Sequence, residues 1–84
     1  MKLLFAEQAW EDYLFWQKTD KKTLKRINRL IEEACRHPFE GIGKPEPLRG
    51  DKRGYWSRRI TNEHRFVYKA EVEFLKIAQL RYHY

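Results

Sequence analysis

The sequence predicts an α+β fold in which two helices pack on a twisted, mainly antiparallel sheet that includes an N-terminal strand. Three observations predict it: a short apolar run at the start of the chain, two stretches with helical apolar spacing, and three strand-like runs joined by short turns. This order of elements is typical of a sheet covered by helices. Because 84 residues leave room for one small core, we expect a single domain over residues 1–84.

The first half of the chain contains the N-terminal strand and both helices. Residues 2–5 form a short apolar run that we expect to be a strand leading into a helix. Apolar residues recur at helical spacing over residues 7–18, and acidic residues crowd the first turn, where the helix dipole favours them. Thr19 and Asp20 can cap a second helix. The apolar stripe of that helix consists of Leu24, Ile27, Leu30, Ile31, Ala34 and Cys35.

Prolines and glycines separate the helices from the later strands. Pro38 ends the second helix. Four residues make the next stretch a conformationally restricted loop: Gly41, Gly43, Pro45 and Pro47. Three strand-like runs follow, at Tyr55–Ile60, His64–Ala70 and Phe74–Tyr82. Their short links predict antiparallel neighbours.

The chain is basic, and its positive charge is unevenly distributed. The formal net charge is +6. Residues 1–42 contain 8 basic and 7 acidic residues, whereas residues 43–84 contain 10 basic and 5 acidic residues. A positive field on one half of a protein favours polyanions such as nucleic acid, although a basic surface can also serve solubility alone.

The chain lacks the residues that several classes of protein need for their function. Cys35 is the only cysteine, which rules out an intrachain disulfide and a thiolate metal cluster and fits the reducing cytoplasm. The histidines His37, His64 and His83 are scattered, so we predict neither a metal nor another cofactor. The segment Gly41–Lys44 lacks the rest of a phosphate-binding glycine-rich motif. No apolar stretch is long enough for a signal peptide or a membrane span.

Cleavage of RNA needs few protein groups, because the 2′-hydroxyl of RNA is a built-in nucleophile. A base, an acid and cations on the phosphate are sufficient. Glu46 is a carboxylate in the restricted loop and can accept the hydroxyl proton, while His83 has an imidazole that can protonate the leaving 5′-oxygen. Taken alone, Glu46 fits a surface carboxylate better than a catalytic base, and His83 can belong to a frayed chain end.

The second half also supplies guanidinium groups for phosphate oxygens: Arg49, Arg58, Arg59, Arg65 and Arg81. Strand alternation sends Arg58 and Arg59 to opposite faces, so only one of them can face the site. Arg59, which shares its face of the strand with Ser57, is the better candidate for phosphate binding. Each arginine can also be a solvated charge on a strand. Tyr82 and Tyr84 offer aromatic faces for unpaired bases or for the core.

The segments that contain these residues resemble the YoeB toxins of the RelE/ParE superfamily of type II toxin–antitoxin systems. The resemblance spans the whole chain and implies a RelE-like fold, similar to microbial ribonucleases. Its most specific segments are Pro38–Gly41, Gly43–Leu48, Trp56–Ile60, Glu63–Arg65 with Val67 and Tyr68, and the ending Arg81–Tyr84.

The resemblance implies a ribosome-dependent endoribonuclease that cleaves messenger RNA in the ribosomal A site and inhibits translation. The implied catalytic residues are Glu46 as the base, His83 as the acid, Arg65 as the phosphate stabiliser and Tyr84 at the scissile bond. Arg59 matches a further basic site residue, and we place Arg81 with it in phosphate binding. Position 49 is a lysine in the family pattern; Arg49 keeps the charge but not the geometry.

The resemblance also implies partners. These are an acidic antitoxin of the YefM type that folds on the toxin, the ribosome with its messenger and ribosomal RNA, and a second copy of the toxin; no membrane is implied. The basic second half of the chain suits an acidic partner segment. The alternative is a non-catalytic basic module that blocks the ribosome or, as in the gyrase-poisoning branch of the superfamily, another target. Such a binder needs the arginines but has no use for an acid and a base together.

Overall fold

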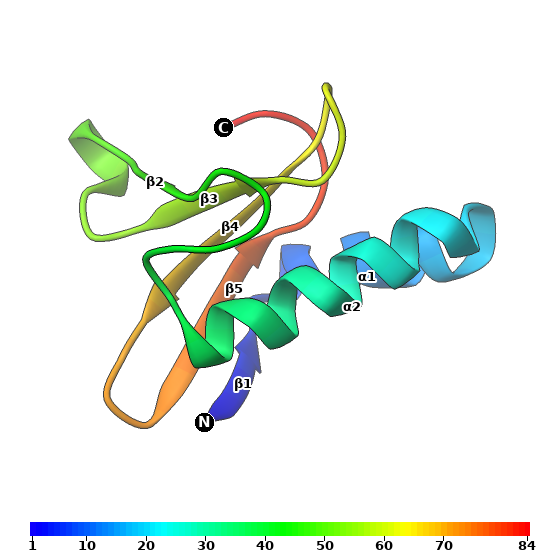
Figure 1. Cartoon of the computed structure of the whole chain (residues 1–84). Coiled ribbons are helices and arrows are strands. Elements are labelled where there is room, and N and C mark those ends of the chain that lie inside the picture. Colours follow the sequence, from blue (N-terminus) through cyan, green and yellow to red (C-terminus); the bar gives the residue numbers. More distant parts are fainter.

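A five-stranded sheet and two helices make up the protein (Figure 1). The structure is a computed structural model that describes all residues, 1–84. Its elements, in chain order, are β1 (Lys2–Phe5), α1 (Glu7–Thr19), α2 (Lys21–Arg36), β2 (Glu46–Pro47), β3 (Trp56–Arg59), β4 (Arg65–Ala70) and β5 (Phe74–Gln79). A one-turn 3₁₀ helix, Gly50–Lys52, lies between β2 and β3. The predicted α+β class is confirmed.

The strands follow the order β1-β5-β4-β3-β2 in the sheet. The segment from β3 to β5 is an antiparallel meander, as its short links predict. The first strand instead pairs parallel with the last, so that Lys2 lies opposite Phe74. The two edge strands of the sheet are therefore β1 and β2, and β4 is the central strand.

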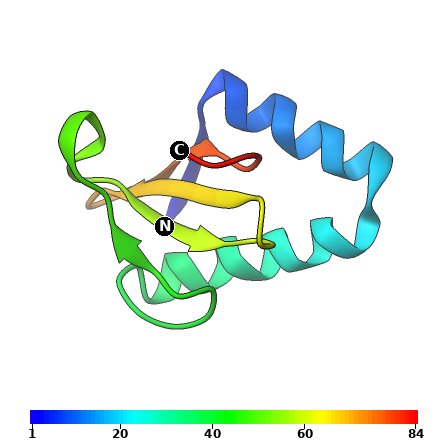
Figure 2. The same cartoon turned by 90° about the horizontal axis from the view of Figure 1, so that it is seen from above.

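The helices cover one face of the sheet and form the core with it. In Figure 2 the turn between α1 and α2 extends beyond the ends of the strands. The apolar stripe of α2 faces the sheet, because four of its residues are buried: Ile27, Leu30, Ile31 and Ala34. They belong to one cluster with the strand residues Phe66, Tyr68, Leu75 and Ile77. Burial of this stripe stabilises α2 far more than its backbone propensity does.

Asp20 caps the start of α2. Its Oδ1 accepts a hydrogen bond from the backbone N–H of Thr23 at 3.1 Å, and its Oδ2 accepts one from the Thr23 hydroxyl at 2.7 Å. These bonds hold the pKa of the Asp20 carboxyl below its usual value. The capping role predicted for Asp20 is confirmed, whereas Thr19 does not cap α2: it is the last residue of α1, and its hydroxyl donates to the carbonyl of Phe15 at 2.7 Å.

We expect the Asp20→Ala variant to have a lower free energy of unfolding than the wild type at neutral pH, because α2 loses its cap. Since the pKa of Asp20 is lowered by folding, this stabilisation is present above the unfolded-state pKa and disappears as pH falls through the folded-state pKa. Urea denaturation at a series of acidic pH values measures the difference. Asp20→Ser, which caps without titrating, is the control. A gap between wild type and Asp20→Ala that stays constant into strong acid would contradict the assignment.

The predicted end of the last strand is wrong. The last strand was expected to continue to Tyr82, but β5 ends at Gln79. The chain leaves the sheet there because the backbone N–H of Leu80 donates to Asp12 Oδ2 at 3.0 Å, and its carbonyl accepts from Trp16 Nε1 at 2.8 Å. Both partners belong to α1, so contacts from the far end of the chain end the strand.

The loop expected around Glu46 also contains a short strand. Glu46 and Pro47 form β2, which pairs with β3 so that Glu46 lies opposite Ser57. Pro47 is compatible with this position because β2 is an edge strand, where a missing N–H removes no necessary ladder bond. The candidate base is consequently fixed in the sheet.

Candidate active site

The two consecutive arginines of β3 have different roles. Arg58 is fully buried, whereas Arg59 is exposed on the opposite side of the strand. Arg58 donates hydrogen bonds to the carbonyl oxygens of His37, Glu40 and Ile42, the last two at 2.9 and 3.0 Å. As alternation predicts, only one residue of the pair is available to a ligand.

A buried tyrosine completes the surroundings of Arg58. Arg58 Nε donates to the Tyr68 hydroxyl at 3.0 Å, and this hydroxyl donates to the carbonyl of Pro38 at 2.6 Å. Burial raises the pKa of Tyr68, and the hydrogen bond from Arg58 opposes that shift. Residues 37–42 form the segment that leads to β2. The hydrogen bonds of Arg58 and Tyr68 hold this segment against the core.

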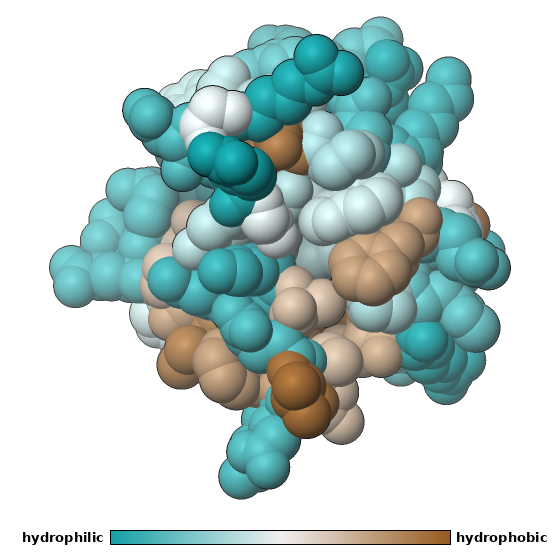
Figure 3. Space-filling model, turned by 90° about the vertical axis from the view of Figure 1, so that its left-hand side faces the viewer, coloured by the Kyte–Doolittle hydropathy of each residue, from teal (hydrophilic) through white to brown (hydrophobic).

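Glu46 lies at the open edge of the sheet, in a shallow hollow of about 390 Å³. Arg49, Lys52 and Tyr84 also line this hollow. The Tyr84 hydroxyl donates to Glu46 Oε1 at 3.4 Å, a long hydrogen bond between the last residue and the edge strand. In Figure 1 the chain end runs back toward β2 and β3, and Figure 3 shows this side of the molecule, whose upper part is mainly hydrophilic.

Arg65 begins β4 directly opposite Arg59 of β3. Its guanidinium is almost buried, with 7% of the residue exposed. A single nitrogen, Nη1, donates to the carbonyl oxygens of Thr61, Asn62 and His64, at 2.8, 3.2 and 3.1 Å. These bonds fix the turn between β3 and β4. The other guanidinium nitrogens, Nε and Nη2, make no hydrogen bond within the chain and remain available to an anion.

His83 lies apart from Glu46. It lines a second hollow, of about 290 Å³, together with Arg81 and with Gln8 and Asp12 of α1. Its imidazole is exposed and makes no hydrogen bond, so rotation of the side chain breaks no contact of this kind. The structure therefore brings Glu46, Arg49 and Tyr84 together in one hollow. The candidate acid, His83, directly precedes Tyr84 in the chain but lines a different hollow.

Arg81 packs between two aromatic rings. Its guanidinium carbon lies 3.5 Å from the ring centroid of Phe15 and 4.6 Å from that of Tyr82. Its Nε is buried and has no hydrogen-bond partner. The faces of this guanidinium are thus occupied by protein, and Arg81 is less free to meet a phosphate than Arg49 or Arg59.

A basic surface on α2 was not predicted from the sequence. Four cations, Lys22, Lys25, Arg26 and Arg29, line a hollow of about 430 Å³ whose far side is Ile60 and Thr61. None of them has a carboxylate partner, because the only ion pair in the protein joins Lys69 and Glu71. The i, i+3, i+4, i+7 spacing of these residues was the signal that could have found them. We call these four residues the α2 basic surface.

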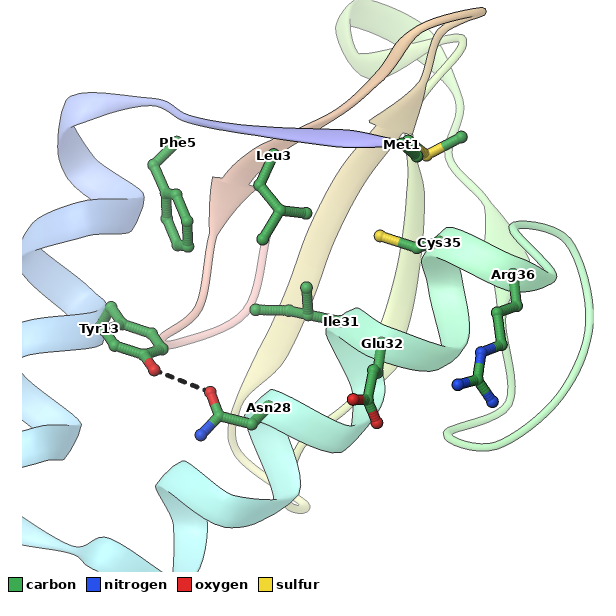
Figure 4. A pocket seen from close by; sticks show the side chains of 9 residues that line it. All are labelled: Met1, Leu3, Phe5, Tyr13, Asn28, Ile31, Glu32, Cys35 and Arg36. Atoms are coloured by element: carbon green, nitrogen blue, oxygen red, sulfur yellow. Dashed lines mark hydrogen bonds between the residues drawn. The ribbon is translucent and has the colours of Figure 1, made fainter.

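The remaining hollow is apolar and lies at the opposite edge of the sheet from Glu46 (Figure 4). It has a volume of about 350 Å³ and is lined by parts of β1, α1 and α2. The Tyr13 hydroxyl donates to Asn28 Oδ1 across its mouth at 2.8 Å. Burial raises the pKa of the Cys35 thiol in its wall, which lowers the fraction of this sulfur present as thiolate.

No three His, Cys, Asp or Glu side chains lie close enough together to hold a metal ion. Neither helix has the length and apolar character needed to cross a membrane. The charged and hydroxyl-bearing side chains that line the hollow at the edge of the sheet are those of Glu46, Arg49, Lys52 and Tyr84.

The mixed sheet, the two covering helices and the returning chain end define a RelE-like toxin fold. Residues 5–84 match the family model described as the YoeB-like toxin of bacterial type II toxin–antitoxin systems. The chain is 57% identical to the toxin YoeB of Escherichia coli K12 over the full length of both proteins. The chain belongs to this YoeB-like toxin family.

Solved structures of relatives agree closely with this fold. A YoeB/ParE toxin from Agrobacterium tumefaciens, 55% identical, superposes with a TM-score of 0.96 over all of both chains. YoeB from Staphylococcus aureus, 47% identical, has been solved as a dimer, with a TM-score of 0.94, and in a heterotetrameric YoeB–YefM complex, with a TM-score of 0.92. Each comparison covers 100% of this chain and 98% of the S. aureus toxin.

Proposed function

We propose that the protein is a ribosome-dependent endoribonuclease that cleaves messenger RNA in the ribosomal A site and so inhibits translation. One observation carries this proposal: the Tyr84 hydroxyl reaches Glu46 in a hollow that Arg49 also lines. A carboxylate, a phenol and a cation at an open sheet edge fit the attack of an RNA hydroxyl on its own phosphate better than simple binding.

In the proposed reaction Glu46 removes the proton of the 2′-hydroxyl, and the resulting oxygen attacks the adjacent phosphorus. The bond to the 5′-oxygen breaks, and His83 gives a proton to that oxygen as it leaves. The products are a 2′,3′-cyclic phosphate and a 5′-hydroxyl. Because Glu46 is exposed, bound RNA has to exclude water around it. Because His83 lines a different hollow from Glu46 and Tyr84, its side chain has to turn toward the substrate.

Arginines stabilise the charge that develops on the phosphate. Arg65 contributes Nε and Nη2, the guanidinium nitrogens that donate to no carbonyl oxygen. Arg59 lies opposite Arg65, on β3. Arg49 lines the hollow of Glu46 and offers a forked donor there. Preorganised cations of this kind act mainly on the transition state, in which the phosphate is most negative.

Primer extension on ribosome-bound messenger tests the proposal. We expect new RNA 5′-ends inside the A-site codon, and we expect the upstream fragments to end in a 2′,3′-cyclic phosphate. Translation arrest with intact messenger would instead identify the protein as a non-catalytic binder.

For its partners we propose an acidic antitoxin of the YefM type and a second copy of the toxin. The S. aureus relative has been solved in both kinds of assembly. An acidic segment also complements the excess of positive charge in residues 43–84.

We propose further that the α2 basic surface binds ribosomal RNA. Exposed cations without carboxylate partners bind RNA phosphates and release counterions, which makes binding salt-dependent. Replacing Lys22, Lys25 and Arg29 by glutamine should weaken ribosome binding and reduce the slope of log K against log salt by about 2 to 3. Arg26 is retained because it donates to the carbonyl oxygens of Arg59 and Ile60.

Sedimentation with ribosomes at several salt concentrations measures this effect. The matched control replaces three cations outside the α2 basic surface, Lys2, Arg36 and Lys76, and changes the net charge equally. An equal loss of binding in both variants would show that only total charge matters.

A further inference from the structure

The chain segment that follows β5, residues 80–84, is held by side chains from other elements. Asp12 and Trp16 of α1 bind the N–H and carbonyl of Leu80, at 3.0 and 2.8 Å. The Gln79 amide donates to the carbonyl oxygens of Arg81, Tyr82 and His83, at 2.8, 3.0 and 2.9 Å. The segment that contains the candidate acid and Tyr84 is therefore placed by hydrogen bonds, although it belongs to no strand.

Tyr82 is the residue at which this segment turns. Its φ of 64° is in the left-handed region, which residues with a Cβ rarely adopt and which needs support from the surroundings. Its backbone N–H donates to His64 Nδ1 at 2.8 Å, and its carbonyl accepts from the N–H of Arg65 at 3.0 Å. Two consecutive residues at the start of β4 thus hold both polar groups of the Tyr82 backbone.

The ring of His64 is fixed in turn by its neighbours. It packs edge-on against Trp16, with 4.9 Å between ring centroids, and at a tilt against Tyr82, with 5.8 Å between centroids. Nδ1 can accept the Tyr82 N–H only when it carries no proton itself. His64 takes no part in the proposed acid–base chemistry. Its hydrogen bond to the Tyr82 backbone gives this histidine a separate role.

We propose that His64 is a positioning residue for the reaction: its Nδ1 lone pair holds Tyr82 in the left-handed turn, and this turn sets the backbone positions of His83 and Tyr84. The inference rests on the proposed function, because the two residues that it places are those assigned to acid catalysis and to the scissile site. His64 lines neither the hollow of Glu46 nor that of His83. Its contribution lies in the geometry of the segment, and small displacements of catalytic groups lower rates strongly.

Two variants separate the hydrogen bond from the packing of the ring. His64→Phe keeps an aromatic ring against Trp16 but has no acceptor. His64→Asn loses the ring but places an amide oxygen near the position of Nδ1. We expect His64→Phe to lower the kcat of messenger cleavage by about 10- to 100-fold with little change in KM, and His64→Asn to recover most of the loss.

Hydrogen exchange of the Tyr82 amide gives a second measurement that does not depend on activity. Exchange should be faster in His64→Phe than in the wild type and again slow in His64→Asn. Thermal unfolding of both variants verifies that they are folded.

Wild-type kcat in His64→Phe would overturn the proposal, and so would equal losses in the two variants, since these would assign the effect to ring packing. If the wild-type protein leaves ribosome-bound messenger intact, the proposed function fails. The exchange of the Tyr82 amide still decides in that case whether His64 holds the segment.

Discussion

Replacing Glu46 by glutamine is expected to lower the rate of messenger cleavage about 10²- to 10⁴-fold, because the amide cannot accept the proton of the 2′-hydroxyl. Glutamine has nearly the same shape, and its amide oxygen can still accept the hydrogen bond that the Tyr84 hydroxyl gives to Glu46. The loss should therefore appear in kcat and leave ribosome binding unchanged. Single-turnover primer extension on ribosome-bound messenger measures the rate.

His83→Ala should reduce the rate over a similar range, and the double variant should lose much less than the product of both effects, because acid and base act in one step. Glu40→Gln, an exposed glutamate on the loop before β2, is the matched control. Wild-type rates in Glu46→Gln or in His83→Ala would rule out the corresponding assignment.

Replacing Arg58 by methionine is expected to lower the free energy of unfolding by about 3–5 kcal/mol, a large part of the stability of a small domain. Methionine fills much of the space but leaves the carbonyl oxygens of His37, Glu40 and Ile42 and the hydroxyl of Tyr68 without their donor. Buried acceptors that lose a charged partner are costly. Urea denaturation followed by circular dichroism measures the change.

Two further variants show whether the cost comes from the hydrogen bonds. Arg58→Lys keeps the charge but not the planar fork that reaches several oxygens, so it should lie between the wild type and methionine. Arg59→Met changes the exposed neighbour and should alter stability by no more than about 0.5 kcal/mol. Similar stabilities for the Arg58→Met and Arg59→Met variants would mean that the buried hydrogen bonds contribute little.

Most elements of the fold could be predicted because their signals are local. The stripe of α2, its Asp20 cap and the opposite orientations of Arg58 and Arg59 in β3 each depend on neighbouring residues. The end of β5 and the short strand β2 depend on distant residues instead. Asp12 and Trp16 remove Leu80 from the sheet, and β3 pairs with a segment that otherwise has the composition of a loop.

The residues of the candidate site could also be predicted from the sequence, whereas several of their contacts could not. Residue types and the family resemblance named Glu46, Arg65, His83 and Tyr84. The structure adds that Tyr84 reaches Glu46, while His83 lines a separate hollow. The sequence could not show that one nitrogen of Arg65 is occupied by the preceding turn. Nor could it show what His64 binds, because that contact depends on the three-dimensional path of the chain.

The parallel pairing of β1 with β5 has a consequence for the order of folding. It joins residues as far apart as Lys2 and Phe74, whereas short turns link β3, β4 and β5. Closing a long loop costs more chain entropy than closing a short one, and contacts between distant residues slow folding. We therefore expect the antiparallel meander to assemble early, with β1 and α1 docking onto it late.

An early intermediate of this kind would already contain Arg65 on β4. It would lack the α1 side chains that bind Leu80, so the segment with His83 and Tyr84 would have no fixed starting point. The proposed nuclease activity should consequently appear only in the last kinetic phase of refolding, after most of the sheet has formed.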